Sequence, residues 1–134
     1  MKLCAAGMAA EGEGRGAEAK ALFEQAWAAS RDDYEACIAA HYVARHQPTP
    51  EAAFEWNERA LRRAEAVGDE RVRGFLPSLH LNYAHSLEQL GRTSEACAYY
   101  DRAAAGLDGL PPGGYANLVR TGVTAGQQRT CGRA

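Results

Sequence analysis

The fold is decided by residues 78–104, which read S-L-H-L-N-Y-A-H-S-L-E-Q-L-G-R-T-S-E-A-C-A-Y-Y-D-R-A-A. The first half of this stretch places large apolar side chains at helical spacing: Leu79, Tyr83, Leu87 and Leu90. Gly91 is a typical helix stop, and Thr93 or Ser94 can cap a second helix that follows at once. The stretch therefore predicts two consecutive helices joined by a tight turn.

Two segments upstream repeat the second half of this pattern. The three copies are A-E-A-K-A-L-F-E-Q-A-W from Ala17, E-A-A-F-E-W-N-E-R-A-L from Glu51 and S-E-A-C-A-Y-Y-D-R-A-A from Ser94. Each carries two alanines seven residues apart, at successive offsets of 34 and 43 residues. Seven residues make about two helical turns, so each alanine pair lies on one helix face and lets another helix approach closely.

These repeats predict an all-α chain of three antiparallel helix-turn-helix units, at about residues 1–31, 33–68 and 70–108. The middle unit begins after the cap residues Asp32 and Asp33, and its second helix begins at Thr49 and Pro50. The longer second offset predicts a lengthened helix or an inserted loop in residues 66–76. We expect one repeat domain over residues 1–110, followed by a capping helix and a flexible tail over residues 111–134.

Composition and charge exclude several classes of partner. The formal net charge is -2, so the chain has no electrostatic footprint for nucleic acid or an anionic membrane. No run approaches the ~20 apolar residues of a membrane span. The four cysteines form no C-x-x-C motif. We expect reduced thiols and a cytoplasmic location.

The repeats resemble tetratricopeptide repeats, and the whole chain is similar to small actinobacterial members of that family. In the third unit the resemblance is carried by Tyr83, Ala84, Leu87, Gly91, Ala96, Tyr100 and Ala103. In the first unit it is carried by Ala6, Gly7, Ala10, Gly14, Ala19, Phe23 and Ala26. The second unit departs from the pattern at His41, Pro48 and Asn57. The resemblance implies a short right-handed α-solenoid whose first helices line a groove that binds peptides or protein segments.

The resemblance also implies which residues line such a groove. In the second unit they are Glu35, Ile38, Tyr42, Arg45 and His46, which share a helix face by their spacing alone. In the third unit they are Ser78, Leu81, Asn82, His85, Glu88 and Gln89. The first unit offers mainly Cys4, Met8 and Glu11. We expect a protein- or peptide-binding module, an adaptor or regulator, although an ordinary solvated face would have the same composition.

A small enzyme or a ligand-binding accessory protein is the alternative. His85 and Glu88 are three residues apart and suit an acid/base pair. Cys37 and His41 are four apart, which suits a nucleophile with its base or two metal ligands, although a buried structural thiol is the simpler interpretation. The other histidine pairs are five apart and diverge on a helix, so we expect no metal and no cofactor. Apolar end faces also allow self-association.

Overall fold

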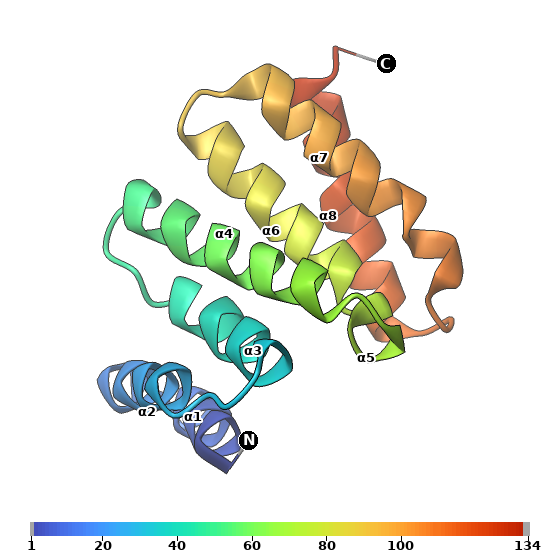
Figure 1. Ribbon diagram of the computed structural model, residues 1–134. Coiled ribbons are helices and arrows are strands. Elements are labelled where there is room, and N and C mark those ends of the chain that lie inside the picture. Colours follow the sequence, from blue (N-terminus) through green and yellow to red (C-terminus); the bar gives the residue numbers. More distant parts are fainter. Residues whose placement is uncertain (1, 133–134) are drawn as a thin grey trace. The chain divides into compact units, whose positions relative to one another are not determined.

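The computed structural model describes residues 2–132, and within that range all regular structure is helical (Figure 1). The elements are α1 (Lys2–Gly12), α2 (Gly16–Ala28), α3 (Asp33–Ala44), α4 (Pro50–Val67), α5 (Glu70–Arg73), α6 (Leu76–Gln89), α7 (Thr93–Ala105), the short 3-10 helix η1 (Leu107–Gly109) and α8 (Gly114–Thr130). The all-α prediction is confirmed. Residues 66–76, where the sequence predicts a lengthened helix or an inserted loop, contain the end of α4, the short helix α5 and the first residue of α6.

Two tight turns of the chain are built in the same way. Gly14 and Gly91 have φ angles of +77° and +78°, and an arginine, Arg15 or Arg92, follows each glycine. The amide of each arginine donates to a carbonyl five residues earlier, over 2.8 Å and 2.9 Å respectively. Both arginines occupy the N-cap position without a side-chain cap, and each pairs with a glutamate three residues on. The shared geometry supports the internal repeat that the sequence indicated.

This turn also corrects one prediction. Thr93 lies inside α7, so the N-cap position falls on Arg92, and capping by Thr93 or Ser94 is wrong. Of the other predicted cap residues, Asp32 and Thr49 are confirmed, whereas Asp33 lies inside α3. The Asp32 side chain accepts a hydrogen bond from the Glu35 amide over 2.8 Å, and Thr49 Oγ1 accepts one from the Ala52 amide over 3.1 Å.

The chain divides into two compact units, Met1–Val67 and Gly68–Ala134. In the first unit α2 packs against α1 and α3, and α3 packs against α4. Phe23 is fully buried, and a Cβ atom built on Gly7 would lie 2.5 Å from its ring. Gly7 therefore lets α1 lie directly on the Phe23 ring. The boundary that the sequence places near residue 110 stays a prediction.

In the second unit α6 and α7 form a pair, and α8 packs on both (Figure 1). Tyr100 of α7 is fully buried, and a Cβ atom on Gly126 of α8 would lie 2.2 Å from its ring. The buried core between these helices contains Ala103, Leu107, Leu110, Ala116, Val119 and Val123. A helix in the C-terminal segment is thus as expected, and residues 133–134 of the expected tail lie outside the described residues.

The expectation of four reduced thiols is wrong for one pair. Cys97 of α7 and Cys131, which ends α8, form a disulfide across a sequence separation of 34. Packing of α8 against α7 brings these two positions together, and no local sequence motif predicts that they are close. Cys4 and Cys37 are free and buried.

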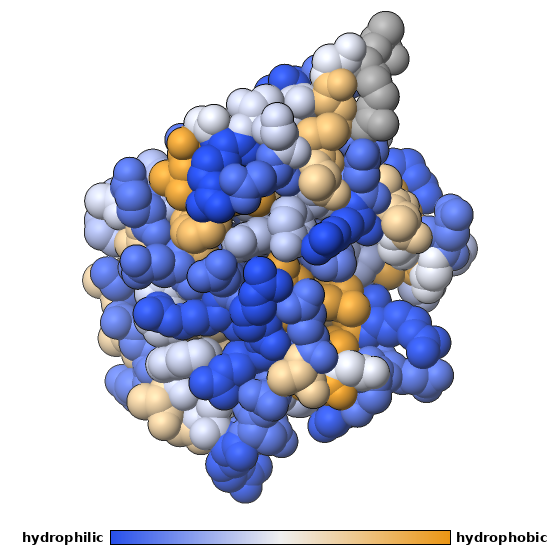
Figure 2. Space-filling model, turned by 45° about the horizontal axis from the view of Figure 1, so that its top comes forward, coloured by the Kyte–Doolittle hydropathy of each residue, from blue (hydrophilic) through white to orange (hydrophobic). Residues whose placement is uncertain are grey.

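The surface is dominated by polar side chains on the face shown in Figure 2, where hydrophobic residues form small patches. Across residues 2–132, none of the helices combines the length and the apolar character needed to cross a bilayer.

Candidate functional site

Two predicted groove residues at the C-terminal end of α3, Arg45 and His46, meet Glu11 of α1 in the first unit. Glu11 Oε2 lies 2.6 Å from His46 Nε2, and Glu11 Oε1 lies 3.3 Å from Arg45 Nη2. The side chains of Glu11 and His46 are 18% and 19% exposed, whereas that of Arg45 is 51% exposed. Glu11 therefore joins α1 to α3 and leaves much of the Arg45 guanidinium at the surface.

Aromatic rings fix the positions of these polar groups. The Phe23 ring stacks on Tyr42 with centroids 4.9 Å apart and on His46 with centroids 5.7 Å apart. The Arg45 guanidinium lies 5.4 Å from the centroid of the Tyr42 ring. Because Phe23 is fully buried, the rings that it supports have little freedom to move. Burial raises the pKa of Tyr42, so its hydroxyl stays protonated near neutral pH.

The opposite end of α3 borders an apolar cavity of about 380 Å³. Its lining consists of Lys2, Leu3, Cys4, Ala26, Ala29, Arg31 and Glu35. Glu35 accepts hydrogen bonds from the amide of Arg31 over 3.1 Å and from its guanidinium over 3.2 Å, and these bonds lower the pKa of Glu35. Glu35 and Arg45, the C-cap residue of α3, are separated by about 15 Å along the helix axis, at a rise of about 1.5 Å per residue.

We give the name α1–α3 face to the predicted groove residues of α1 and of the segment from Glu35 to His46. They are Met8, Glu11, Glu35, Ile38, Tyr42, Arg45 and His46. Ile38 is partly buried against the core, and Met8 of α1 is 43% exposed. The structure brings Arg45 and His46 against Glu11 with Tyr42 beside Arg45, and it places Glu35 with Cys4 in the cavity lining. Sequence reasoning missed the role of the buried Phe23 ring beneath this surface. It also missed the cavity-lining residues other than Cys4 and Glu35, which are Lys2, Leu3, Ala26, Ala29 and Arg31.

In the second unit α8 engages several predicted groove residues of α6. The Ser78 hydroxyl is hydrogen-bonded to the Tyr115 hydroxyl, which donates to the Gly74 carbonyl over 3.0 Å. Leu81 packs where Gly122 of α8 approaches α6. Asn82 is partly exposed, and His85 and Gln89 are exposed.

Glu88 is the most strongly bonded of these residues. It accepts hydrogen bonds from Arg129 over 2.7 Å and 3.1 Å and from the Tyr100 hydroxyl over 2.7 Å. The Arg129 guanidinium lowers the pKa of Glu88. Burial, aided by the Glu88 carboxylate, raises the pKa of Tyr100 to about 12. A carboxylate held anionic by three donors is a poor general acid, so this geometry does not favour an acid/base pair with His85.

The structure does not favour Cys37 and His41 as a nucleophile with its base. The Cys37 thiol donates to the Tyr34 carbonyl over 3.1 Å, and burial raises the pKa of Cys37 to about 11. Burial, with a smaller contribution from the Arg45 charge, lowers the pKa of His41 to about 4. Near neutral pH the thiol is therefore protonated and the imidazole neutral, which fits a structural role for Cys37.

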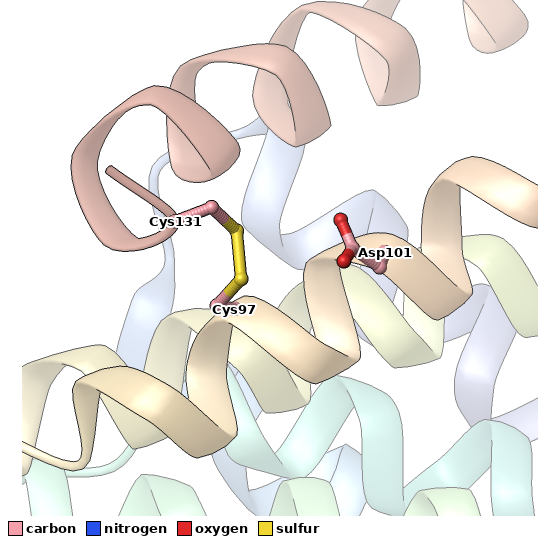
Figure 3. Close-up of side chains that lie close together, drawn as sticks. All are labelled: Cys97, Asp101 and Cys131. Atoms are coloured by element: carbon pink, nitrogen blue, oxygen red, sulfur yellow. A yellow bond between two sulfur atoms is a disulfide. The ribbon is translucent and has the colours of Figure 1, made fainter. Parts of the chain in front are cut away.

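A second polar cluster lies outside every residue that the sequence singled out for the groove. Cys97 and Asp101 of α7 lie beside Cys131 at the end of α8 (Figure 3). In the sequence, Cys97 and Asp101 are four residues apart, which is a visible signal, but Cys131 is too distant for any spacing rule to include it.

Comparisons with protein-family models, with curated proteins and with solved structures found no match to this chain.

Proposed function

We propose that the α1–α3 face binds a short, extended peptide segment of a partner protein. The observation that carries this proposal is the presence of two unlike subsites at opposite ends of α3. An apolar cavity of about 380 Å³ lies at one end, and the exposed guanidinium of Arg45 beside Tyr42 lies at the other. Peptide recognition commonly combines an apolar anchor with a small number of directed polar contacts.

The separation of the subsites sets the length of the ligand. An extended chain advances about 3.3 Å per residue, so ~15 Å corresponds to between about four and five residues. We expect an apolar side chain to enter the cavity and a carboxylate, four or five residues away, to meet Arg45. Arginine is suited to this role because its planar guanidinium binds carboxylates through two parallel hydrogen bonds.

The finer architecture belongs to the same proposal. A tetratricopeptide-like, right-handed arrangement of the helix pairs would place α1 and α3 as first helices, which line the ligand groove in that family. The repeated turns at Gly14 and Gly91 support such an arrangement. A cytoplasmic location is also part of this proposal; free Cys4 and Cys37 accord with it, whereas the Cys97–Cys131 disulfide does not.

The experiment selects binders with the intact chain and maps them with single substitutions. The immobilised protein is used to enrich a random library of seven-residue peptides, and the affinities of enriched peptides are measured by fluorescence anisotropy. We expect Tyr42→Ala and Arg45→Ala each to weaken binding about 30-fold, corresponding to about 2 kcal/mol. Ala29→Leu, which fills the cavity, should weaken peptides with a large apolar residue most.

Arg62→Ala is the matched control. Arg62 is 51% exposed, as Arg45 is, and it pairs with Glu65 on α4. Its loss should leave the affinity unchanged. Peptides that bind Tyr42→Ala, Arg45→Ala and the parent chain equally well would show that the α1–α3 face is not the binding site.

A further inference from the structure

The cluster of Cys97, Asp101 and Cys131 has the geometry of a three-ligand cation site. The two sulfur atoms and a carboxylate oxygen all lie within 4.8 Å of one another. Cys97 and Asp101 are one turn apart on α7, and Cys131 approaches from α8, with the Cα atoms of the two cysteines 5.1 Å apart (Figure 3). The donors therefore converge from two helices on one point.

These cysteines differ from the other two in their access to solvent. Cys97, Asp101 and Cys131 are each partly exposed, whereas Cys4 is 2% and Cys37 is 0% exposed. A reductant or a cation can consequently reach the cluster without unfolding the chain. The Asp101 carboxylate is also oriented, because its Oδ1 accepts a hydrogen bond from Gln127 Nε2 over 2.9 Å. Oriented carboxylates of this kind are typical of metal ligands.

We propose that Cys97 and Cys131 form a reversible disulfide, and that the reduced pair binds Zn²⁺ together with Asp101. A dithiol reductant supplies two electrons and two protons, the Sγ–Sγ bond breaks, and the reductant itself becomes a disulfide. Zn²⁺ then binds both sulfurs as thiolates and releases the two thiol protons to solvent. Water completes the tetrahedral shell. The two states exclude each other, because each sulfur bonds either to its partner or to the cation.

The donor set is the reason for choosing zinc. Two thiolates and one carboxylate are ligands that Zn²⁺ accepts, at distances of about 2.3 Å to sulfur and about 2.0–2.2 Å to oxygen. Hard cations such as Mg²⁺ and Ca²⁺ prefer oxygen ligands alone. The expectation of no metal rested on histidine spacing and on Cys37, and it did not consider these residues. The inference is independent of the peptide-binding proposal, because it concerns the second unit.

The test uses the full chain in both redox states. One sample is reduced with a phosphine and desalted without oxygen, and the other keeps its disulfide. Each is titrated with Zn²⁺ against a chromophoric chelator. We expect one Zn²⁺ per reduced chain and none per oxidised chain. Co²⁺ added to the reduced chain should give the thiolate-to-metal charge-transfer band and the intense visible bands of tetrahedral sulfur coordination.

Substitutions separate this site from other thiols. Cys97→Ser and Cys131→Ser should abolish binding, and Asp101→Asn should weaken it at least tenfold. Cys37→Ser, which removes a buried thiol outside the cluster, should bind Zn²⁺ as the parent chain does. Circular dichroism confirms that each variant is folded. The absence of bound Zn²⁺ in the reduced chain, or equal binding by folded Cys131→Ser, would overturn the proposal.

Discussion

At the scale of single residues, the α1–α3 face has ionic contacts at Glu11, and beside it lies His41, whose pKa burial lowers. Glu11 contacts the Arg45 guanidinium and the His46 ring and is partly exposed, while His41, next to Tyr42 in the sequence, is partly buried and neutral near pH 7. The charges nearest to His41 are Arg45, which opposes its protonation, and Glu11, which favours it. Burial outweighs both and sets the direction of its pKa.

His41 should therefore make stability depend on pH. Its pKa is about 4 in the folded chain and about 6.5 in the unfolded chain, so between these values only the unfolded chain takes up the proton. The free energy of unfolding should fall as the pH drops from 6.5 to 4, by at most about 1.4 kcal/mol per pH unit. His41→Asn should remove this slope. Urea denaturation of both proteins at several pH values measures it.

The carboxyl group of Glu88 affects stability mainly below the pH range in which His41 acts. The lowered pKa of Glu88 contributes stability that is lost only as the pH falls below about 4.5. The difference between the parent chain and His41→Asn at pH 5 to 6.5 therefore reports on His41. Equal slopes for the two proteins would contradict the assignment.

At the scale of elements, α8 depends on a glycine at its contact with α7. Any side chain at Gly126 would meet the buried Tyr100 ring, which is itself held by Glu88 and Arg129. Because the ring is fully buried and its hydroxyl is bonded to Glu88, we expect the two helices to separate instead. By contrast, a Cβ atom built on Gly114, in the first turn of α8, would have no neighbouring atom within 4 Å.

Gly126→Ala should consequently destabilise the second unit by ~1–3 kcal/mol, because it overpacks the contact. Gly114→Ala should be neutral or stabilise slightly, because alanine restricts the unfolded chain and meets no neighbour. Thermal unfolding followed by circular dichroism compares the two variants. Equal transition temperatures would show that Gly126 does not set the distance between α7 and α8.

The sequence predicted the local features of this architecture and missed the contacts between residues that are far apart in the chain. Gly91, Thr49 and Asp32 mark helix ends because their signals lie within a few residues of the structure that they determine. The α3 residues of the face were predictable for the same reason, since helical spacing alone puts them on one side.

Contacts across the chain had no such signal. Arg129 bonds to Glu88 over 41 residues, and Cys131 bonds to Cys97 over 34. Both depend on the path of α8, which packing decides. The Phe23 ring was identified as a repeat position, but its support of Tyr42 and His46 requires the packed arrangement of α1, α2 and α3.

At the scale of the whole molecule, the two compact units differ in what stabilises them. The disulfide lies entirely in the second unit, and both tryptophans, Trp27 and Trp56, lie in the first. Tryptophan fluorescence therefore reports on the first unit, whereas helical circular dichroism reports on both. Unfolding followed by the two signals can separate the units without any substitution.

Reduction in the presence of a chelator should destabilise the second unit alone. Opening a loop of this length removes about 3–4 kcal/mol in the chain-entropy model. We expect the fluorescence transition to keep its denaturant midpoint and the circular dichroism transition to gain an earlier phase. A common shift of both signals would mean that the two units unfold as one cooperative body.

The link from Cys97 to Cys131 also changes what a break in the backbone means. The connection between α7 and α8 contains η1 and the exposed Pro111, Pro112 and Gly113. With the disulfide closed, these residues belong to a covalent ring, so a nick there produces two chain ends but no separate fragment. The C-terminal helix would remain tethered in register with α7 and leave only after the sulfurs part. In this segment the backbone can therefore be cut without the molecule coming apart.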